Sequence, residues 1–232
     1  MIDDTTCLLL FVKYPDKGKV KSRLSKEFGE DTVLFLYEAF VLDVLETLNK
    51  GKYRFKICFH PPSAREKIAL WLGKSYLYMP QNGSALGEKM KNAFASAFSE
   101  GFEKVMLIGS DIPDLPKEII DEAFASDGEA VIGPAMDGGY YLIGFKRDTF
   151  LPHIFEGMEW STGSVFERTM GIFRKHSCKV HVLPQWRDVD TTEDLRGLYE
   201  RNRNTAFMHS RTMAFITKNM KKLFQDTPGL SG

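Results

Sequence analysis

The amino-acid sequence predicts an α/β fold, because apolar runs of strand length alternate with segments whose apolar residues repeat at helical spacing. One such run, residues 105–108, is followed shortly by Asp111, and another leads into the turn Asp137-Gly138-Gly139. Ligands of open α/β sheets bind where the strands end. The pattern therefore places two candidate carboxylates, Asp111 and Asp137, near a ligand.

The N-terminal half alternates strands with helices. Residues 7–12 form an all-apolar run, which is typical of a strand covered on both faces. Residues 31–48 carry apolar side chains at i, i+3, i+4 and i+7, which predicts a core-facing helix. By the same criteria we expect further strands at 53–59 and 76–79, and helices at 64–71 and from the turn after residue 80 to about residue 98.

The C-terminal half continues the pattern. Pro116 suits the first turn of a helix that runs to about residue 124, and a helix at 165–175 and a strand at 180–183 follow. From Leu195 onward we expect helix, which packs on the domain or forms a homodimer contact rather than lying on a membrane. The chain is thus divided into a domain at 1–204 and a helical extension at 205–232, whose tail we expect to fray.

Composition excludes several classes of protein. Lys plus Arg and Asp plus Glu each number 31 among 232 residues, so no global field favours nucleic acid or an acidic membrane. The N-terminus has acidic residues where a signal peptide is basic, and no apolar run reaches the ~18 residues of a membrane helix. The three cysteines lack metal-binding spacing and fit buried thiols. We therefore expect a cytoplasmic protein.

A basic loop directly follows the first strand. Lys13, Lys17, Lys19, Lys21 and Arg23 crowd into it, opposed by one aspartate. α/β folds that bind nucleotides place their phosphate site here, so we expect a phosphate ligand, with a solvated loop as the alternative. The loop has neither a G-x-G-x-x-G nor a Walker pattern, which disfavours hydride-transfer enzymes and P-loop ATPases.

Two glycine-containing turns admit both a structural and a ligand-binding interpretation. The turn that contains Gln81 and Gly83 suits a helix N-terminus, or a loop that contacts a base or ribose. The turn at Asp137 fits a hairpin, and its glycines would also let backbone approach a ligand closely. His60, at the end of the second expected strand, is interpreted as structural.

A last acidic segment, WRDVDTTEDL, precedes the C-terminal helices. Asp190 or Thr191 can cap the helix that follows. Capping does not account for Asp188, which leaves it as a candidate ligand-binding carboxylate.

Five segments together resemble a bacterial glycosyltransferase-like family, often labelled a domain of unknown function, within the nucleotide-diphospho-sugar transferase (GT-A) superfamily. This family is related to molybdopterin guanylyl- and phospholactate guanylyltransferases. The resemblance covers roughly residues 7 to 200, and its motifs are FVKYPDKGKVKSRL, PQNGSALGEKM, VMLIGSDIPDLP, VIGPAMDGGYYLIGF and WRDVDTTEDL. It implies a three-layer α/β/α sandwich with a central mixed, mainly parallel sheet.

The resemblance also implies roles for individual residues. Asp111 would bind Mg²⁺ or Mn²⁺, with Asp188 and Asp190 as further metal ligands. The basic loop with Lys13, Lys21 and Arg23 would hold a diphosphate, and the turns that contain Gln81, Gly83, Gly138 and Gly139 would contact the nucleotide. Asp111 is not part of the D-x-D of many glycosyltransferases, which brings the chain nearer to the nucleotidyltransferases of the superfamily.

Three functions remain open from the sequence. The first is metal-dependent transfer of a sugar from a nucleotide sugar to a small-molecule acceptor, with Asp137 as the general base. The second is nucleotidyl transfer from a nucleoside triphosphate to a phosphorylated acceptor, which needs no base. The third is a non-catalytic module that binds a nucleotide sugar.

Overall fold

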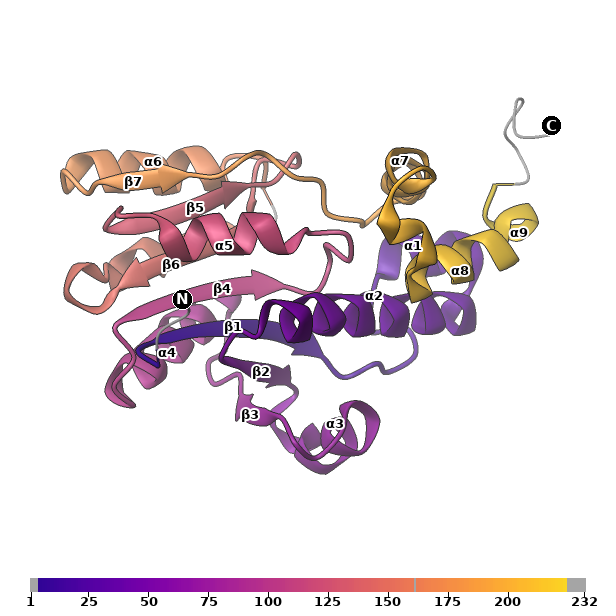
Figure 1. The fold of residues 1–232 in the computed structure, drawn as a ribbon, viewed down its shortest axis with the longest axis horizontal. Helices are drawn as coiled ribbons and strands as arrows, with labels where there is room; N and C mark the ends of the chain where they lie inside the picture. Colours follow the sequence, from indigo (N-terminus) through magenta and orange to yellow (C-terminus); the bar gives the residue numbers. More distant parts are fainter. Residues whose placement is uncertain (1–3, 161, 225–232) are drawn as a thin grey trace. The chain divides into compact units, whose positions relative to one another are not determined.

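The computed structural model describes residues 4–160 and 162–224 (Figure 1). The tail at 225–232, for which the sequence predicts fraying, lies outside the described residues, as does Ser161. The chain forms two compact units. Unit 1 comprises Met1–Tyr14, Thr47–Ser110 and Leu115–Asp188, and unit 2 comprises Pro15–Glu46, Asp111–Asp114 and Val189–Gly232.

Unit 1 is built on a seven-stranded sheet of order β3-β2-β1-β4-β6-β5-β7. In this sheet β6 runs antiparallel to both of its neighbours, β4 and β5, and the remaining pairs of strands named here run parallel. The predicted mixed, mainly parallel sheet is therefore confirmed. The strands are β1 (Thr6–Lys13), β2 (Phe55–His60), β3 (Leu77–Pro80), β4 (Lys104–Gly109), β5 (Ala130–Pro134), β6 (Tyr140–Lys146) and β7 (Val180–Val182).

The burial of each strand follows its place in the sheet. β1 lies between β2 and β4, and its residues from Cys7 to Leu10 are fully buried. This explains the all-apolar run, because a parallel strand covered on both faces has no polar side. The edge strands β3 and β7 are shorter, and Leu77 and Val182 on them are exposed.

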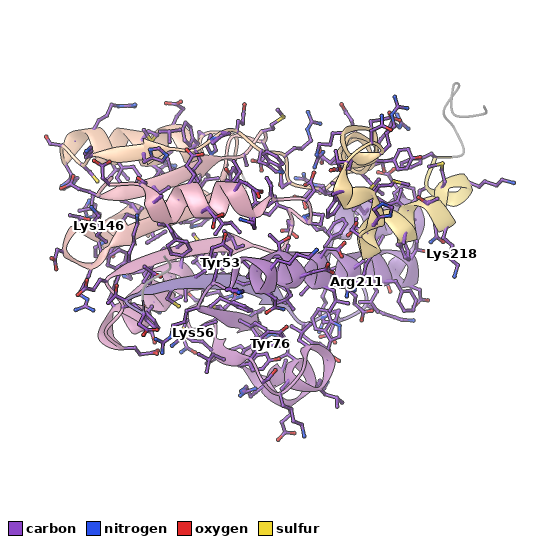
Figure 2. All side chains as sticks on the ribbon, viewed as in Figure 1. Tyr53, Lys56, Tyr76, Lys146, Arg211 and Lys218 are labelled. Atoms are coloured by element: carbon purple, nitrogen blue, oxygen red, sulfur yellow. The ribbon has the colours of Figure 1, made fainter. Side chains whose placement is uncertain are left out.

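Helices cover both faces of this sheet. Figure 1 shows α5 (Lys117–Ala125) on the near face, with α4 (Leu86–Ser99) and α6 (Val165–Lys175) on the far face. Phe94 of α4 packs edge-on against Phe145 of β6, with ring centroids 5.2 Å apart. On α5, Asp121 Oδ1 lies 2.6 Å from the hydroxyl of Tyr53, which precedes β2 (Figure 2). Unit 1 also contains α3 (Arg65–Leu72) and the short helices η1 (Pro62–Ala64), η2 (Arg147–Thr149) and η3 (Pro152–Phe155).

Unit 2 is helical and has its own core. Its helices are α1 (Ser22–Phe28), most of α2 (Glu30–Gly51), α7 (Thr192–Asn202), η4 (Ala206–His209), α8 (Arg211–Lys218) and α9 (Met220–Phe224). Buried side chains from early and late in the sequence form one cluster: Leu24, Phe28, Val33, Leu36, Phe40, Val189, Leu195, Leu198, Met213, Ile216, Leu223 and Phe224. Residues after 204 thus share a core with residues 24–40. The boundary between 204 and 205 stays a prediction about domain organisation.

The helix boundaries depart from the sequence expectations at three places. Pro116 is the N-cap of α5 rather than a member of its first turn, with extended backbone angles. The helix α1 begins within the segment expected to be a basic loop. The C-terminal helical region is interrupted after Asn202, and α8 restarts where Asp43 Oδ2 accepts from the Thr212 amide at 2.8 Å.

None of the helices in the described part of the chain is both long enough and apolar enough to cross a bilayer.

Candidate functional site

Unit 2 brings three of the predicted site residues into one cluster. Lys21 Nζ lies 2.6 Å from Asp111 Oδ1 and 2.7 Å from Asp190 Oδ1. The Lys21 side chain is only 4% exposed, whereas those of Asp111 and Asp190 are 47% and 41% exposed. A buried ammonium therefore holds two carboxylates whose other sides reach solvent. We call these residues the Lys21 cluster.

The backbone of Lys21 is unusual for its residue type. Lys21 caps the N-terminus of α1 in the left-handed region, with φ 47° and ψ 51°, where non-glycine residues are uncommon. Its carbonyl oxygen accepts from the Ser25 amide at 2.9 Å, so the backbone is tied to the helix. Its ammonium lies 5.8 Å from the centre of the Phe40 ring, on α2. Such strained conformations concentrate at functional sites.

Asp111 lies two residues after the end of β4, and its backbone is held in place by a hydrogen bond. Its carbonyl oxygen accepts from the Val189 amide at 2.9 Å, which ties it to the segment that carries Asp190. Three residues on, the buried Asp114 accepts from Arg201 Nε at 2.6 Å and from Asn202 Nδ2 at 2.7 Å. The buried Asp114 carboxylate therefore anchors the loop to α7. The Asp111 carboxylate is paired with Lys21 instead.

The sequence left open whether Asp190 or Thr191 caps α7, and Thr191 does. Thr191 Oγ1 accepts from the Asp194 amide, and Asp194 Oδ2 accepts from the Thr191 amide at 2.9 Å, which is a capping box. The Asp190 side chain is bonded to Lys21 instead. The backbone of Asp190 is held by the same capping residue, because the Asp190 amide donates to Asp194 Oδ2 at 3.2 Å.

The electrostatics of the cluster keep Lys21 charged. Burial alone would lower the pKa of the Lys21 ammonium, but the charges of Asp111 and Asp190 and the hydrogen bonds to them outweigh it, so its pKa is raised above 10.5. With two carboxylates and one ammonium, the cluster has a formal charge of −2 + 1 = −1.

The donor set of the cluster fits a hard divalent cation. Mg²⁺ and Mn²⁺ take oxygen ligands, and Mg²⁺ is commonly held by one or two carboxylates with substrate phosphates and water as the rest. Asp111 and Asp190 are two half-exposed carboxylates that already converge on one cation. Among the residues that the structure describes, no group of three or more His, Cys, Asp or Glu could hold a metal by itself.

The other basic residues of the loop are more exposed. Lys17 and Lys19 form ion pairs with Asp31 and Asp16, and each of these side chains is at least 37% exposed. Arg23 is exposed on α1. The solvated-loop interpretation thus fits Lys17 and Lys19, but not the buried Lys21.

Several predicted residues lie along the carboxyl edge of the sheet in unit 1. Lys13 pairs in register with His60 at the ends of β1 and β2. Gln81 follows β3, and its Nε2 lies 2.6 Å from the Cys58 carbonyl oxygen and 3.4 Å from that of Val12. The buried Gln81 amide group therefore links the ends of neighbouring strands. Its role in nucleotide binding stays a prediction.

Lys89, a residue that the sequence analysis does not single out, acts on this edge of the sheet together with Lys13. Burial and the charges of Lys89 and Lys13 lower the pKa of His60. His60 Nδ1 is buried, and no partner for it is found among the described residues. Lys89 lies in the first turns of α4, in the same segment as Gly83. Lys89 could have been identified from the sequence only by considering the basic residues in the first turn of this helix as possible ligand contacts.

The turn that contains Gly83 is packed against α4. Gly83 has φ +136°, and a Cβ there would lie 2.9 Å from the Lys89 backbone nitrogen. Glu88 Oε2 accepts from the Ser84 amide at 2.8 Å. These contacts match the helix-start interpretation, and a contact of Gly83 with a nucleotide stays a prediction.

The Asp137 side chain stabilises the turn between β5 and β6. Its Oδ1 accepts from the Gly139 amide at 2.8 Å, as the hairpin interpretation implies. Gly138 has φ +86°, and a Cβ on it would lie 2.1 Å from the Gly163 carbonyl oxygen. Asp137 is exposed, and a role as general base stays a prediction. Asp188 is half-buried at the end of unit 1, and its role as metal ligand is likewise untested.

Comparison with known structures identifies the fold. The chain is similar to the crystal structure of a "putative nucleotide-diphospho-sugar transferase" from Desulfovibrio desulfuricans G20, with 42% identity and a TM-score of 0.92, over 95% of this chain and 97% of that one. A nucleotidyl transferase from Methanothermobacter is 11% identical with a TM-score of 0.59, over 86% of this chain and 98% of that one. The 4-diphosphocytidyl-2C-methyl-D-erythritol synthase from Anaerococcus prevotii is 12% identical with a TM-score of 0.55, over 87% and 100%. The last two support the fold alone.

A search of curated proteins found no match to this sequence. Residues 43–162 match the family model DUF2064, described as an uncharacterized protein conserved in bacteria. The resemblance expected from the five motifs is thereby confirmed. The chain belongs to the DUF2064 family and has the fold of the nucleotide-diphospho-sugar transferases.

Proposed function

We propose that this protein is a transferase that uses a nucleotide-diphosphate donor together with Mg²⁺ or Mn²⁺. The observation that carries the proposal is the Lys21 cluster, in which Asp111 and Asp190 converge on one cation and stay half-exposed. The similarity to a chain named as a "putative nucleotide-diphospho-sugar transferase" supports it.

The proposed chemistry follows from the charge that such a transfer creates. Cleavage of a bond to a diphosphate leaves negative charge on the departing phosphate, and a bound divalent ion would stabilise that charge as a Lewis acid. Asp111 and Asp190 would hold the ion. Lys21 and the exposed Arg23, two residues further along the chain, would donate hydrogen bonds to the phosphate oxygens.

Sugar transfer to a small-molecule acceptor is the first candidate within this class. An acceptor hydroxyl then needs a base, and Asp137 is the proposed residue. Asp137 Oδ1 accepts from the Gly139 amide, and the carboxylate is exposed. A carboxylate can accept at several positions, so the turn and a base function are compatible.

Nucleotidyl transfer from a nucleoside triphosphate is the second candidate, and one observation favours it. The segment proposed to bind metal has Asp111 without a D-x-D, and the second carboxylate, Asp190, comes from a distant segment instead. In this reaction the acceptor is a phosphate that is already ionised, so Asp137 would have no chemical role. A non-catalytic module that binds a nucleotide sugar is the third candidate.

A thermal-shift panel separates these candidates. UDP, GDP, CDP and ADP sugars are compared with the matching triphosphates, each with and without Mn²⁺. A ligand at ~100 times its dissociation constant adds roughly 2.7 kcal/mol to stability. At ~2–4 °C per kcal/mol for a chain of this size, that is a shift of several degrees.

The outcomes differ for each candidate. A Mn²⁺-dependent shift with one nucleotide sugar supports sugar transfer, and a shift with triphosphates alone supports nucleotidyl transfer. Asp111→Asn should remove the Mn²⁺ dependence, whereas Asp16→Asn, whose partner Lys19 is exposed, should not. A shift that does not depend on Mn²⁺, with no turnover, favours the binding module. No shift across the whole panel would contradict the proposal.

A further inference from the structure

Lys21 occupies the position at which a cation would join the two carboxylates. We propose that Lys21 is the resident cation of the Asp111–Asp190 pair, and that a divalent ion and a diphosphate bind together because the ion displaces the Lys21 ammonium, which then pairs with the diphosphate. This inference rests on the proposed function, and it changes the role of Lys21 from a simple phosphate contact to a link between two ligands.

The geometry supports displacement rather than addition. One ammonium lies within 2.7 Å of an oxygen from each carboxylate. A divalent ion bound to the same two oxygens would sit at ~2.1 Å from each, within the space that the ammonium fills. Two cations cannot share that space, because their charges repel over such a short separation. The ion and the ammonium are therefore alternatives at these oxygens.

Burial explains why the ammonium needs a new partner when it moves. Lys21 is 4% exposed, and its ammonium is paired with the carboxylates of Asp111 and Asp190. An ammonium that lost both partners without reaching water or another anion would be an uncompensated buried charge. A diphosphate bound next to the cluster would supply the replacement anion.

The local structure lets the side chain move while the backbone stays. The Lys21 carbonyl oxygen is bonded to the Ser25 amide, and the residue is fixed at the cap of α1. The lysine side chain is a flexible four-carbon chain that ends in a compact charge, so its ammonium can change partners. The Asp111 carbonyl oxygen accepts from the Val189 amide, and the Asp190 amide donates to Asp194 Oδ2, so the backbones of both aspartates are held in place.

The consequence is positive coupling between metal and diphosphate. Metal alone must displace a paired ammonium, and diphosphate alone meets an ammonium that is already paired. Each ligand removes the obstacle to the other, so each should raise the affinity for the other by the same factor.

Lys21→Met tests displacement with Mn²⁺ alone, because methionine keeps an unbranched apolar side chain beside Phe40 and removes the charge. We expect this variant to bind Mn²⁺ at least tenfold more tightly than the unaltered protein, measured by the electron paramagnetic resonance signal of free Mn²⁺. Lys19→Met is the matched control, since Lys19 pairs with Asp16 at 3.6 Å outside the cluster. Its Mn²⁺ affinity should stay unchanged.

Coupling is tested by repeating the titration with inorganic pyrophosphate present, corrected by a protein-free titration for the Mn²⁺ that pyrophosphate itself binds. For the unaltered protein, pyrophosphate should raise the Mn²⁺ affinity at least tenfold, and Lys21→Met should lose most of that gain. Lys21→Gln, which keeps hydrogen-bond donors, replaces Lys21→Met if the latter does not fold. An unchanged or weaker Mn²⁺ affinity in the folded variant would overturn the proposal, as would an absence of Mn²⁺ binding in both proteins.

The two proposals fail in different ways. Neither titration uses a nucleotide, so a protein that binds no nucleotide but shows these Mn²⁺ and pyrophosphate effects would contradict the proposed function and support the role of Lys21. A protein that binds a nucleotide but whose Mn²⁺ affinity does not respond to Lys21→Met would do the reverse.

Discussion

Asp111 and Asp137 both follow a strand of the sheet, yet their carboxylates are used differently. Asp111 pairs with the buried ammonium of Lys21 and shares it with Asp190. Asp137 bonds the amide of Gly139, two residues further along the chain. The first set of partners comes from distant parts of the sequence and the second from the same turn. A carboxylate whose partners are distant is placed by the fold, which is the arrangement a binding site requires.

Removing the Asp111 carboxylate should have the largest effect on function and sharpens this comparison most. We expect Asp111→Ala to lower Mn²⁺-dependent turnover of the identified donor by at least ~10²-fold, because a preorganised charged group at the site is lost. Steady-state assays across Mn²⁺ concentrations measure it. Near-normal turnover in a folded Asp111→Ala variant would show that Asp111 is no more functional than a turn residue.

The loop that carries Asp111 depends on Asp114. Asp114→Ala should lower the free energy of unfolding by ~3 kcal/mol, because the side chains of Arg201 and Asn202 lose a buried partner. Urea denaturation measures this change. The control Asp16→Ala removes an exposed pair and should cost less than ~1 kcal/mol. Equal costs would mean that the Asp111 loop is not anchored as described.

The Asp137 turn depends on backbone rather than charge. Gly138→Ala should cost ~2 kcal/mol, because a left-handed backbone and a close approach to the Gly163 carbonyl oxygen both oppose a Cβ. Gly157→Ala is the matched control, with φ +61° and no atom within 4 Å of an added Cβ, so it should cost only the ~1 kcal/mol of the backbone. A Gly138 variant as stable as the Gly157 variant would remove the packing argument.

The smallest effect is expected for the Asp137 side chain. Asp137→Ala should cost ~1 kcal/mol through the lost bond to the Gly139 amide, and Asp137→Asn, which keeps an acceptor oxygen, should cost less. Turnover of Asp137→Asn then separates the chemistry. A loss of sugar transfer with unchanged stability would identify a base, and retained turnover would leave Asp137 as a turn residue.

The sequence predicted the elements that depend on local pattern. The helix expected at 165–175 is observed as Val165–Lys175, because its apolar stripe is regular. The helix α1 was not expected, since its seven residues lie in a basic segment, and the break after Asn202 depends on Asp43, which is far away in sequence. A search for apolar residues at helical spacing in a short stretch of sequence therefore identifies neither the short helix α1 nor the break after Asn202.

The sequence likewise predicted some features of the candidate site and not others. Lys21, Asp111 and Asp190 were each singled out, but for separate reasons, and no local pattern indicated that one ammonium would join both carboxylates. The residues that position them, Asp114 and Arg201, carry no motif that distinguishes them from surface charges. Their role follows from burial and pairing, which only the folded chain defines.

A crystal structure with Mn²⁺ and a nucleoside diphosphate tests the central claim most directly. The account predicts that anomalous scattering places manganese on the Asp111 and Asp190 carboxylates, with Lys21 Nζ turned from them to a phosphate oxygen. Manganese bound away from both aspartates, or a Lys21 ammonium still paired with both while metal and diphosphate are bound, would contradict it.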